Sequence, residues 1–214
     1  MILAVDVHYE QDCGYAAGLL FAQWDDVAPL AVFSKKQPGV GEYVPGEFYK
    51  RELPCILALL DELGQLPATI VIDGFVFLDG HAQAGLGKHL YDALGGKSRV
   101  IGVAKTAYAG IGDDYTLLRG DSIKALFITC IGLELAAARE HIAAMHGPHR
   151  MPVLLKTVDR LCREQALAGA AGLAGPAAPA PQVSALTPRS GSGTPTPHPC
   201  TAPFPDRPRP RSGK

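Results

Sequence analysis

The sequence has few of the residues from which small secreted domains and zinc modules are built. Its 214 residues include five cysteines, an odd number, and no two of them form a Cys-x-x-Cys pair. A disulfide framework or a zinc knuckle is therefore not predicted, and the expected compartment is a reducing cytoplasm. The sequence also lacks a run of 18 apolar residues, and its opening segment MILAVDVHYE carries an acid at the sixth position. We therefore expect neither a membrane span nor a signal peptide.

An excess of charge of either sign is also lacking. Twenty Lys and Arg residues face 21 Asp and Glu residues, for a formal net charge of −1, which excludes a polycation of the chromatin or ribosomal type. The absence of a GxxxxGK[ST] loop disfavours hydrolysis of nucleoside triphosphates. The absence of a GxSxG motif disfavours an α/β-hydrolase.

The composition changes near residue 168. Eleven of the 18 prolines fall within 168–214, which hold five bases and one acid, whereas residues 1–167 hold 15 bases and 20 acids. We therefore predict a single folded domain over 1–167 and a basic, disordered, partly polyproline tail over 168–214. The tail has either no specific function or a weak electrostatic contact with nucleic acid. Because no apolar pattern follows Gln165, a chain cut there is expected to keep its thermal midpoint.

The body predicts three β-strands followed by alternating helices and strands. Turn-rich segments separate the first three strands, so an antiparallel meander is expected. The predicted strands are 2–9, 14–23, 28–36, 68–77, 99–106 and 122–130, and the predicted helices are 48–63, 85–94, 133–145 and 153–165. This order predicts an α/β fold with a mixed sheet, and it resembles the order of ribonuclease H-like folds.

Two aspartates interrupt strands that have a buried, apolar pattern. Asp6 lies within ILAVDV and Asp73 ends the segment TIVID. Either one alone is explained as a hydrogen-bonded strand-end or turn residue, but two on separate buried strands favour a hard divalent cation such as Mg²⁺ between them. Glu52, on the helix that follows EYVPG, is a third candidate ligand or else a solvated helix residue.

Four segments, in this order and spacing, resemble the endonuclease V family, ribonuclease H-like nucleases that act on deaminated nucleic acid. They cover about residues 2–165 and leave the tail unmatched. The four are AVDVHY (4–9), EYVPGEFYKRELP (42–54), VIDG (71–74) with GLGKHL (85–90) behind it, and VIGVAKT (100–106).

The resemblance implies a metal site and a cationic side chain beside it. Asp6, Glu52 and Asp73 match the family's metal-binding carboxylates, for Mg²⁺ or for Mn²⁺ in its place. Lys105 matches a lysine near the scissile phosphate, where a fixed positive charge offsets developing negative charge. Without the resemblance, Lys105 is equally well explained as a strand-end lysine that extends to solvent.

The resemblance also implies a loop that opens the nucleic-acid duplex. The family has a wedge there that separates the strands around the lesion, where an aromatic ring replaces the stacking lost when a base leaves the helix. Without the resemblance, the same segment is only a β-turn. The matching residues are Tyr43, Val44, Pro45 and Gly46.

The sequence departs from the family at three places. Phe75 stands where the family's Asp-Gly-His-Gly motif has histidine, although Asp79 and His81 follow in the same loop. Thr129 stands where Gly-His-Arg has the active-site histidine; a threonine can hold a water but is a poor metal ligand. Asp159, in the last predicted helix, is a candidate replacement acid or else an exposed helix residue. The sequence also begins at the first predicted strand, where the family has a preceding helix.

The function that the resemblance implies is a metal-dependent endonuclease. It would hydrolyse a phosphodiester one nucleotide beyond inosine, on the 3′ side, in DNA or RNA, as a monomer with no membrane partner. Two alternatives stay open. The missing histidines favour a nucleic-acid-binding protein of the same fold with weak or lost cleavage, and a ribonuclease H-like nuclease could act on another structured substrate such as branched DNA. The three carboxylates and the lysine favour the enzyme.

Overall fold

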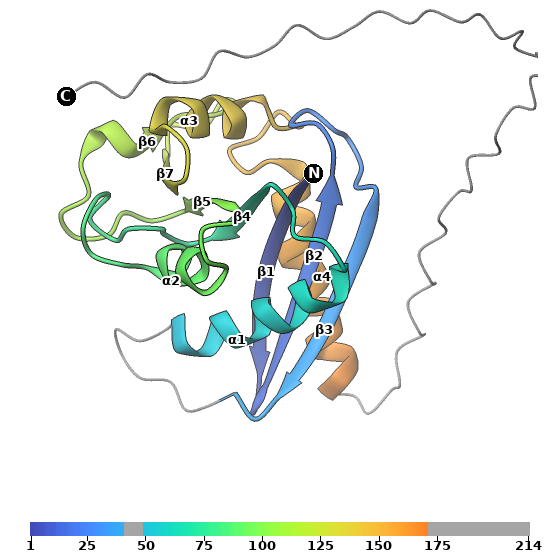
Figure 1. Ribbon diagram of the computed structural model, residues 1–214. Helices are drawn as coiled ribbons and strands as arrows, with labels where there is room; N and C mark the ends of the chain where they lie inside the picture. Colours follow the sequence, from blue (N-terminus) through green and yellow to red (C-terminus); the bar gives the residue numbers. More distant parts are fainter. Residues whose placement is uncertain (41–48, 171–214) are drawn as a thin grey trace, which may run out of the picture. The chain divides into compact units, whose positions relative to one another are not determined.

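The structure, a computed structural model, describes residues 1–40 and 49–170. Within these ranges, the strands form one mixed sheet in the order β3-β2-β1-β4-β5-β7-β6 (Figure 1). The β1, β4 and β5 strands are parallel, and the other neighbouring strands are antiparallel. The strands are β1 (Ile2–Glu10), β2 (Cys13–Phe21), β3 (Ala31–Pro38), β4 (Thr69–Asp73), β5 (Arg99–Ala104), β6 (Thr116–Leu117) and β7 (Leu126–Ile131).

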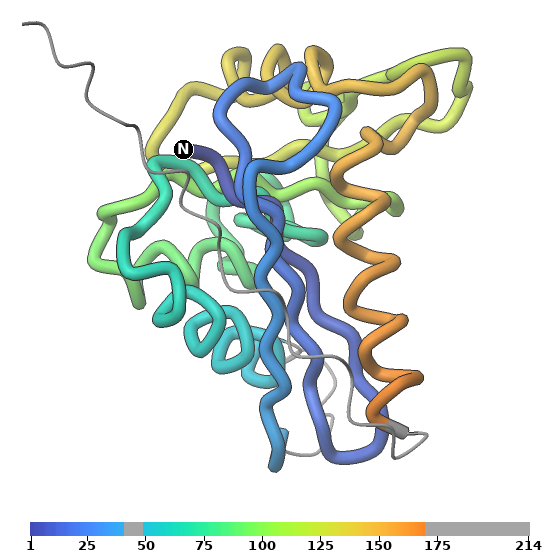
Figure 2. Tube along the Cα trace, turned by 90° about the vertical axis from the view of Figure 1, so that its right-hand side faces the viewer, coloured from blue at the N-terminus to red at the C-terminus, as the bar shows by residue number. Residues whose placement is uncertain are grey.

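Helices cover both faces of this sheet. The long α4 lies along one face of β1 and β2, and α1 crosses the opposite face (Figures 1 and 2). The helices are α1 (Tyr49–Leu60), α2 (Leu86–Ala93), α3 (Leu135–Ala144) and α4 (Val153–Ala170), with 3₁₀ turns η1 (Asp61–Leu63) and η2 (Asp113–Tyr115).

The sheet separates two apolar clusters, and the alternation of side chains along β1 supplies both. Ile2 and Ala4 pack into the cluster beneath α3 and α4, whereas Leu3 and Val5 pack into the cluster beneath α1 and α2. Because successive side chains of a strand point to opposite faces, Asp6 shares the α4 face with Ile2 and Ala4. An acid therefore occupies the next position of an otherwise apolar row.

The predicted fold class is confirmed, and the first three strands form the expected meander. Two predicted strands are too long. The β4 strand ends at Asp73 rather than at residue 77, because Gly74 has a positive φ of 125° and turns the chain out of the sheet. The β7 strand begins at Leu126 rather than at 122, since the Ser122 hydroxyl accepts a hydrogen bond from Lys124 N–H and forms a local turn. The two-residue β6 was not predicted.

The last helix extends beyond its predicted end at Gln165. It continues to Ala170, with Ala166 fully buried. A Cβ at Gly169 would lie 2.3 Å from the hydroxyl of Tyr15, so this glycine packs directly against β2. The expectation that nothing after Gln165 packs on the core is therefore wrong, because small residues continue a buried stripe that larger apolar residues begin. The predicted disorder of the tail stays a prediction, since 171–214 lie outside the described residues.

Truncation should locate the end of the folded domain. A chain ending at Gln165 loses the burial of Ala166 and the contact at Gly169, about 1 kcal/mol of packing. We expect its thermal midpoint to fall by about 2–4 °C relative to a chain ending at Ala170, as measured by circular dichroism. Equal midpoints for the two truncated chains would show that this last turn contributes nothing.

Candidate active site

Three aspartates meet where β1 and β4 end. The parallel pairing places Val5 beside Ile72, so Asp6 and Asp73 are the next residues of their strands in the same register. Both have the strand position that faces α4, and Asp159 comes from α4 itself. One carboxylate oxygen from each of the three lies within 4.8 Å of the other two.

The Asp159 side chain is part of this cluster rather than an exposed helix residue. It is 29% exposed, and it lies one turn from Leu155, which lines a small cavity together with Asp6 and Asp73. Arg163 donates to Asp159 Oδ1 from Nη2 at 3.0 Å and from Nε at 3.2 Å. These hydrogen bonds hold the pKa of Asp159 below its usual range. The carboxylate therefore stays charged and its orientation is fixed.

The site disfavours a negative charge on Asp6, as the pKa of this carboxyl indicates. Burial, followed by the charge of Asp73, raises the pKa of Asp6 to about 7, although a 2.8 Å hydrogen bond from Val7 N–H opposes the shift. A divalent cation relieves such repulsion, and carboxylate oxygens are the donors that hard cations prefer. The three aspartates therefore fit a divalent metal ion.

Glu52 reaches the site from the opposite face of the sheet. It lies on α1 and is buried, so the solvated helix glutamate is not what the structure shows. Burial first, and then the charges of Asp6 and Asp73, raise the pKa of Glu52 well above its usual range. Glu52 is outside the group of three aspartates within 4.8 Å, but it lines a second cavity together with Asp73.

Lys105 follows β5 and faces the aspartates. Its Nζ lies 2.6 Å from Asp73 Oδ2. Burial alone would lower the pKa of Lys105, but the hydrogen bond and charge of Asp73 outweigh it, so the pKa is raised and the ammonium is retained. The guanidinium of Arg150 donates to the carbonyl oxygens of both Lys105 and Ala125. The backbone that carries the lysine is therefore tied to the start of β7.

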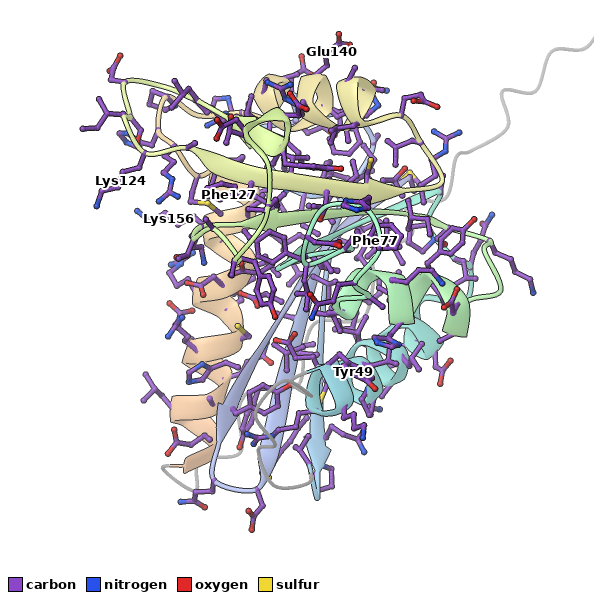
Figure 3. All side chains as sticks on the ribbon, turned by 90° about the vertical axis from the view of Figure 1, so that its left-hand side faces the viewer. Tyr49, Phe77, Lys124, Phe127, Glu140 and Lys156 are labelled. Atoms are coloured by element: carbon purple, nitrogen blue, oxygen red, sulfur yellow. The ribbon has the colours of Figure 1, made fainter. Side chains whose placement is uncertain are left out.

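A cavity of about 160 Å³ adjoins Asp73. In Figure 3, Tyr49 at the start of α1 and Lys156 on α4 lie on opposite sides of β1, and the cavity is on the Tyr49 side. The Tyr49 ring stacks on His89, with centroids 3.7 Å apart. Phe75, in place of the family's histidine, is part of the cavity wall. The lining residues are Tyr49, Glu52, Asp73, Gly74, Phe75, Leu78, Ala84, Gly85 and Leu86.

Thr129 holds the loop that leaves β4. Its buried hydroxyl accepts a 2.8 Å hydrogen bond from Val76 N–H. That this hydroxyl holds a water stays a prediction. The neighbouring β5 residue is Gly102, where a Cβ would lie 2.6 Å from the carbonyl oxygen of Gly74. The glycine and the threonine together let the chain after Asp73 lie close against the sheet.

Asp79 and His81 do not line the cavity. Asp79 Oδ1 accepts hydrogen bonds from the N–H groups of His81, Ala82 and Gln83, and these bonds, Ala82 first, lower its pKa to about 2. The His81 side chain is 75% exposed. Asp79 therefore stabilises its own loop. The predicted wedge residues 43–46 lie outside the described residues, so their role stays a prediction.

Comparison with known proteins decides the family. Residues 1–146 match the endonuclease V family, and an endonuclease V from Streptomyces coelicolor is 32% identical over 190 residues, which are 76% of this chain and 77% of that protein. The chain belongs to the endonuclease V family. It is accordingly a nuclease, and the resemblance found in its four motifs is confirmed.

Solved structures of endonuclease V share this fold. The crystal structure of the Streptomyces avermitilis protein is 29% identical, with a TM-score of 0.62 over 79% of this chain and 82% of that one. The Ciona intestinalis endonuclease V, solved with a 24-mer DNA containing an inosine followed by a ribo-adenosine, has a TM-score of 0.65 at 16% identity over 77% and 84% of the two chains. Within residues 1–40 and 49–170, no helix is long and apolar enough to cross a membrane.

The raised pKa of Asp6 predicts a pH-dependent stability of the metal-free nuclease. Its carboxyl keeps a proton up to about pH 7 in the folded chain and releases it near 3.8 when unfolded. This contribution to stability is complete below about pH 4 and is lost as the pH rises through 7. We expect the free energy of unfolding, measured with urea in EDTA, to fall more between pH 5 and pH 8 in the parent than in Asp6→Asn. Equal falls would show that the pKa of Asp6 is not raised in the folded chain.

Proposed function

We propose that this chain is a metal-dependent endonuclease that hydrolyses a phosphodiester on the 3′ side of inosine in DNA or RNA, as a step of nucleic-acid repair. The observation that carries the proposal is the convergence of Asp6, Asp73 and Asp159 beside Lys105 and a cavity. Membership in the endonuclease V family supports it, as does the inosine-containing DNA bound by the Ciona relative.

In this proposal Asp6, Asp73 and Asp159 hold Mg²⁺, or Mn²⁺ in its place, and Glu52 completes the site from the other face of the sheet. When bound, the metal would activate a water and stabilise the departing 3′-oxygen. The chain's own contribution is to fix the oxygen donors in advance. Arg163 orients the carboxylate of Asp159, and Val7 N–H orients that of Asp6.

Lys105 is proposed to contact the phosphate that is cut. Its ammonium lies 2.6 Å from Asp73 and is 40% exposed, so it can reach an oxygen of a bound phosphate without leaving the site. A fixed positive charge there stabilises negative charge as it develops on the phosphate. Arg150 limits the movement of the backbone at Lys105, which keeps this charge in place.

The cavity beside Asp73 is proposed to hold the deaminated base. Enzymes that recognise a damaged base take it out of the stack into a pocket and pay for unstacking, least where pairing is already weak. Phe75 and Tyr49 give this cavity flat aromatic surface, and Gly74 and Gly85 let the base approach backbone. The cavity adjoins Asp73, so a base held there would lie close to the carboxylates.

The loss of the family's histidines is the strongest argument for a protein that binds without cleaving. Asp159 lies within the carboxylate cluster, where it can serve as a further ligand, and the Thr129 hydroxyl accepts a hydrogen bond from the loop after β4. These observations favour the enzyme.

A nicking assay tests the proposal. Oligonucleotides with one inosine, and matched undamaged ones, are incubated with the chain in Mg²⁺ or in EDTA. We expect cleavage only at inosine and only with metal. Cleavage of both substrates would favour a nuclease for another structured substrate, such as branched DNA, and binding without cleavage would favour the non-cleaving protein.

Asp73→Asn should abolish cleavage without loss of stability. The substitution removes a metal ligand and relieves repulsion with Asp6, while the lost ion pair with Lys105 is worth little because both side chains are more than one third exposed. We expect an inactive variant whose thermal midpoint equals or slightly exceeds that of the parent without metal, and which Mn²⁺ no longer stabilises.

The matched control is Asp92→Asn, which removes a carboxylate paired with Lys88 on the surface of α2. It should keep full activity. An unstable Asp73→Asn variant that still cuts at inosine would remove Asp73 from the site.

The proposed wedge has its own test. If Tyr43 replaces the stacking of an extruded base, Tyr43→Ala should reduce cleavage of inosine in duplex far more than in single strands, where the base is already unstacked. Equal losses on the two substrates would assign Tyr43 to packing of the domain.

We further propose that the nuclease acts as a monomer in the cytoplasm. The carboxylates, the lysine and the cavity all come from one chain. The four cysteines among the described residues, Cys13, Cys55, Cys130 and Cys162, are free thiols, which suits a reducing compartment.

A further inference from the structure

A third aromatic side chain, Tyr108, stands beside the cavity and has no part in the site described above. Tyr108 follows Lys105 by three residues, and its ring meets Phe75 edge-on, with centroids 6.3 Å apart and planes at 66°. Phe75 lines the cavity, whereas Tyr108 does not line it and is 38% exposed. The tyrosine therefore stands outside the aromatic wall and keeps part of its ring in solvent.

The Tyr108 ring is held in place before any ligand binds. Gln83 Nε2 donates to the Tyr108 hydroxyl at 3.3 Å. The backbone of Gln83 is fixed in turn, because its N–H donates to Asp79 Oδ1 at 2.9 Å and its carbonyl accepts from Leu78 N–H at 2.7 Å. The charge-assisted hydrogen bonds at Asp79 thus stiffen the loop that positions the tyrosine.

The loop is also packed against the segment that carries Tyr108. At Gly80, which has a positive φ of 97°, a Cβ would lie 2.3 Å from the ring of Tyr115 in η2. The loop after β4 and the chain after β5 therefore hold each other at two points, Gly80 with Tyr115 and Gln83 with Tyr108. A large, partly exposed ring in such a rigid setting gives up little conformational entropy when it makes a new contact.

The positions of neighbouring residues indicate which nucleotide would meet the ring. Lys105 and Asp73, at the carboxylate cluster, precede Tyr108 and Phe75 by three and two residues. The aromatic pair thus lies on the two chain segments that leave the carboxylate cluster, with Phe75 in the cavity wall and Tyr108 against Phe75 on the segment that carries Lys105. If the cut falls one nucleotide beyond the base in the cavity, on its 3′ side, the intervening nucleotide lies between that base and the bond at the carboxylates.

We propose that Tyr108 is the stacking surface for the nucleobase directly 3′ of the one held in the cavity. This inference rests on the proposed function. When a base leaves the stack its neighbour loses a partner, and an aromatic side chain can replace that partner whatever the identity of the neighbour. Tyr108 is therefore a substrate-positioning residue that acts on the nucleotide between the lesion and the cut.

The test places the fluorescent base 2-aminopurine on either the 3′ or the 5′ side of inosine. Its emission is low while it is stacked and rises when a stacking partner is lost. The full chain is mixed with each oligonucleotide in Mg²⁺ in a stopped-flow instrument, which records binding before cleavage. With the parent and with Tyr108→Phe, the 3′ probe should stay quenched; with Tyr108→Ala its emission should rise, while the 5′ probe should be the same for all three proteins.

Tyr108→Ala should weaken binding of the oligonucleotide but leave the rate of cleavage nearly unchanged. Loss of one stacking contact should weaken binding of the inosine oligonucleotide by Tyr108→Ala about tenfold. Single-turnover cleavage at saturating enzyme should stay within about twofold of the parent, because the carboxylates are untouched. Gln83→Leu keeps the ring but removes its hydrogen bond, and should give a smaller loss that is again confined to the 3′ probe.

The control is Leu30→Ala, which truncates a side chain that is 64% exposed before β3, at the end of the sheet away from the site. It should change neither the probe signals nor the affinity. If the parent cuts at inosine but Tyr108→Ala leaves the 3′ probe quenched, or if the 5′ probe responds instead, the assignment of Tyr108 is overturned and the proposed function stands. If the parent neither binds nor cuts at inosine, the proposed function itself fails.

Discussion

Repulsion among carboxylates is the constraint on which this structure depends. Asp6, Asp73 and Asp159 lie close enough to share one ion, and Glu52 adds its charge from a buried position. Such a group is unfavourable without a cation, so the rest of the fold must hold it together. The apolar clusters on both faces of the sheet supply that stability. Lys105 and Arg163 each offset part of the charge from outside the cluster.

The site belongs to both layers of the molecule at once. Asp159 comes from the helix on one face of the sheet, and Glu52 from the helix on the other, while Asp6 and Asp73 lie on the strands between them. Strand alternation alone would place every β1 and β4 acid on one side. Glu52 is the fourth carboxylate. It meets the group at Asp73, because β4 ends there and the Asp73 side chain also lines the cavity next to α1.

Asp6 and Asp73 could be predicted from the sequence because each acid interrupts an apolar strand pattern, and such an interruption is apparent from the neighbouring residues alone. It was less effective for Asp159, whose pairing with Arg163 four residues later looks like an ordinary surface helix pair. Glu52 was supported chiefly by the family resemblance.

The hydrogen bond between Thr129 and Val76 joins residues 53 positions apart, and the close contact of Gly102 with Gly74 depends on the conformation of the loop after β4. Neither contact can be predicted from a pattern of neighbouring residues. The same holds for the end of α4. Ala166 is buried there and Gly169 packs against Tyr15 of β2. Such small residues do not form an apolar pattern strong enough to predict this packing from the sequence.

The placement of α4 has a consequence for how the protein is made. The first strand carries Asp6 and the last helix carries Asp159, so almost the whole domain must be synthesised before both are present. Until α4 emerges, the face of β1 and β2 that includes Ile2, Ala4 and Leu19 lacks its cover, and a nascent chain would expose it as an apolar surface. The acids therefore meet only when the final helix docks. Chain order thus postpones the least favourable contact of the fold until most of the stabilising ones exist.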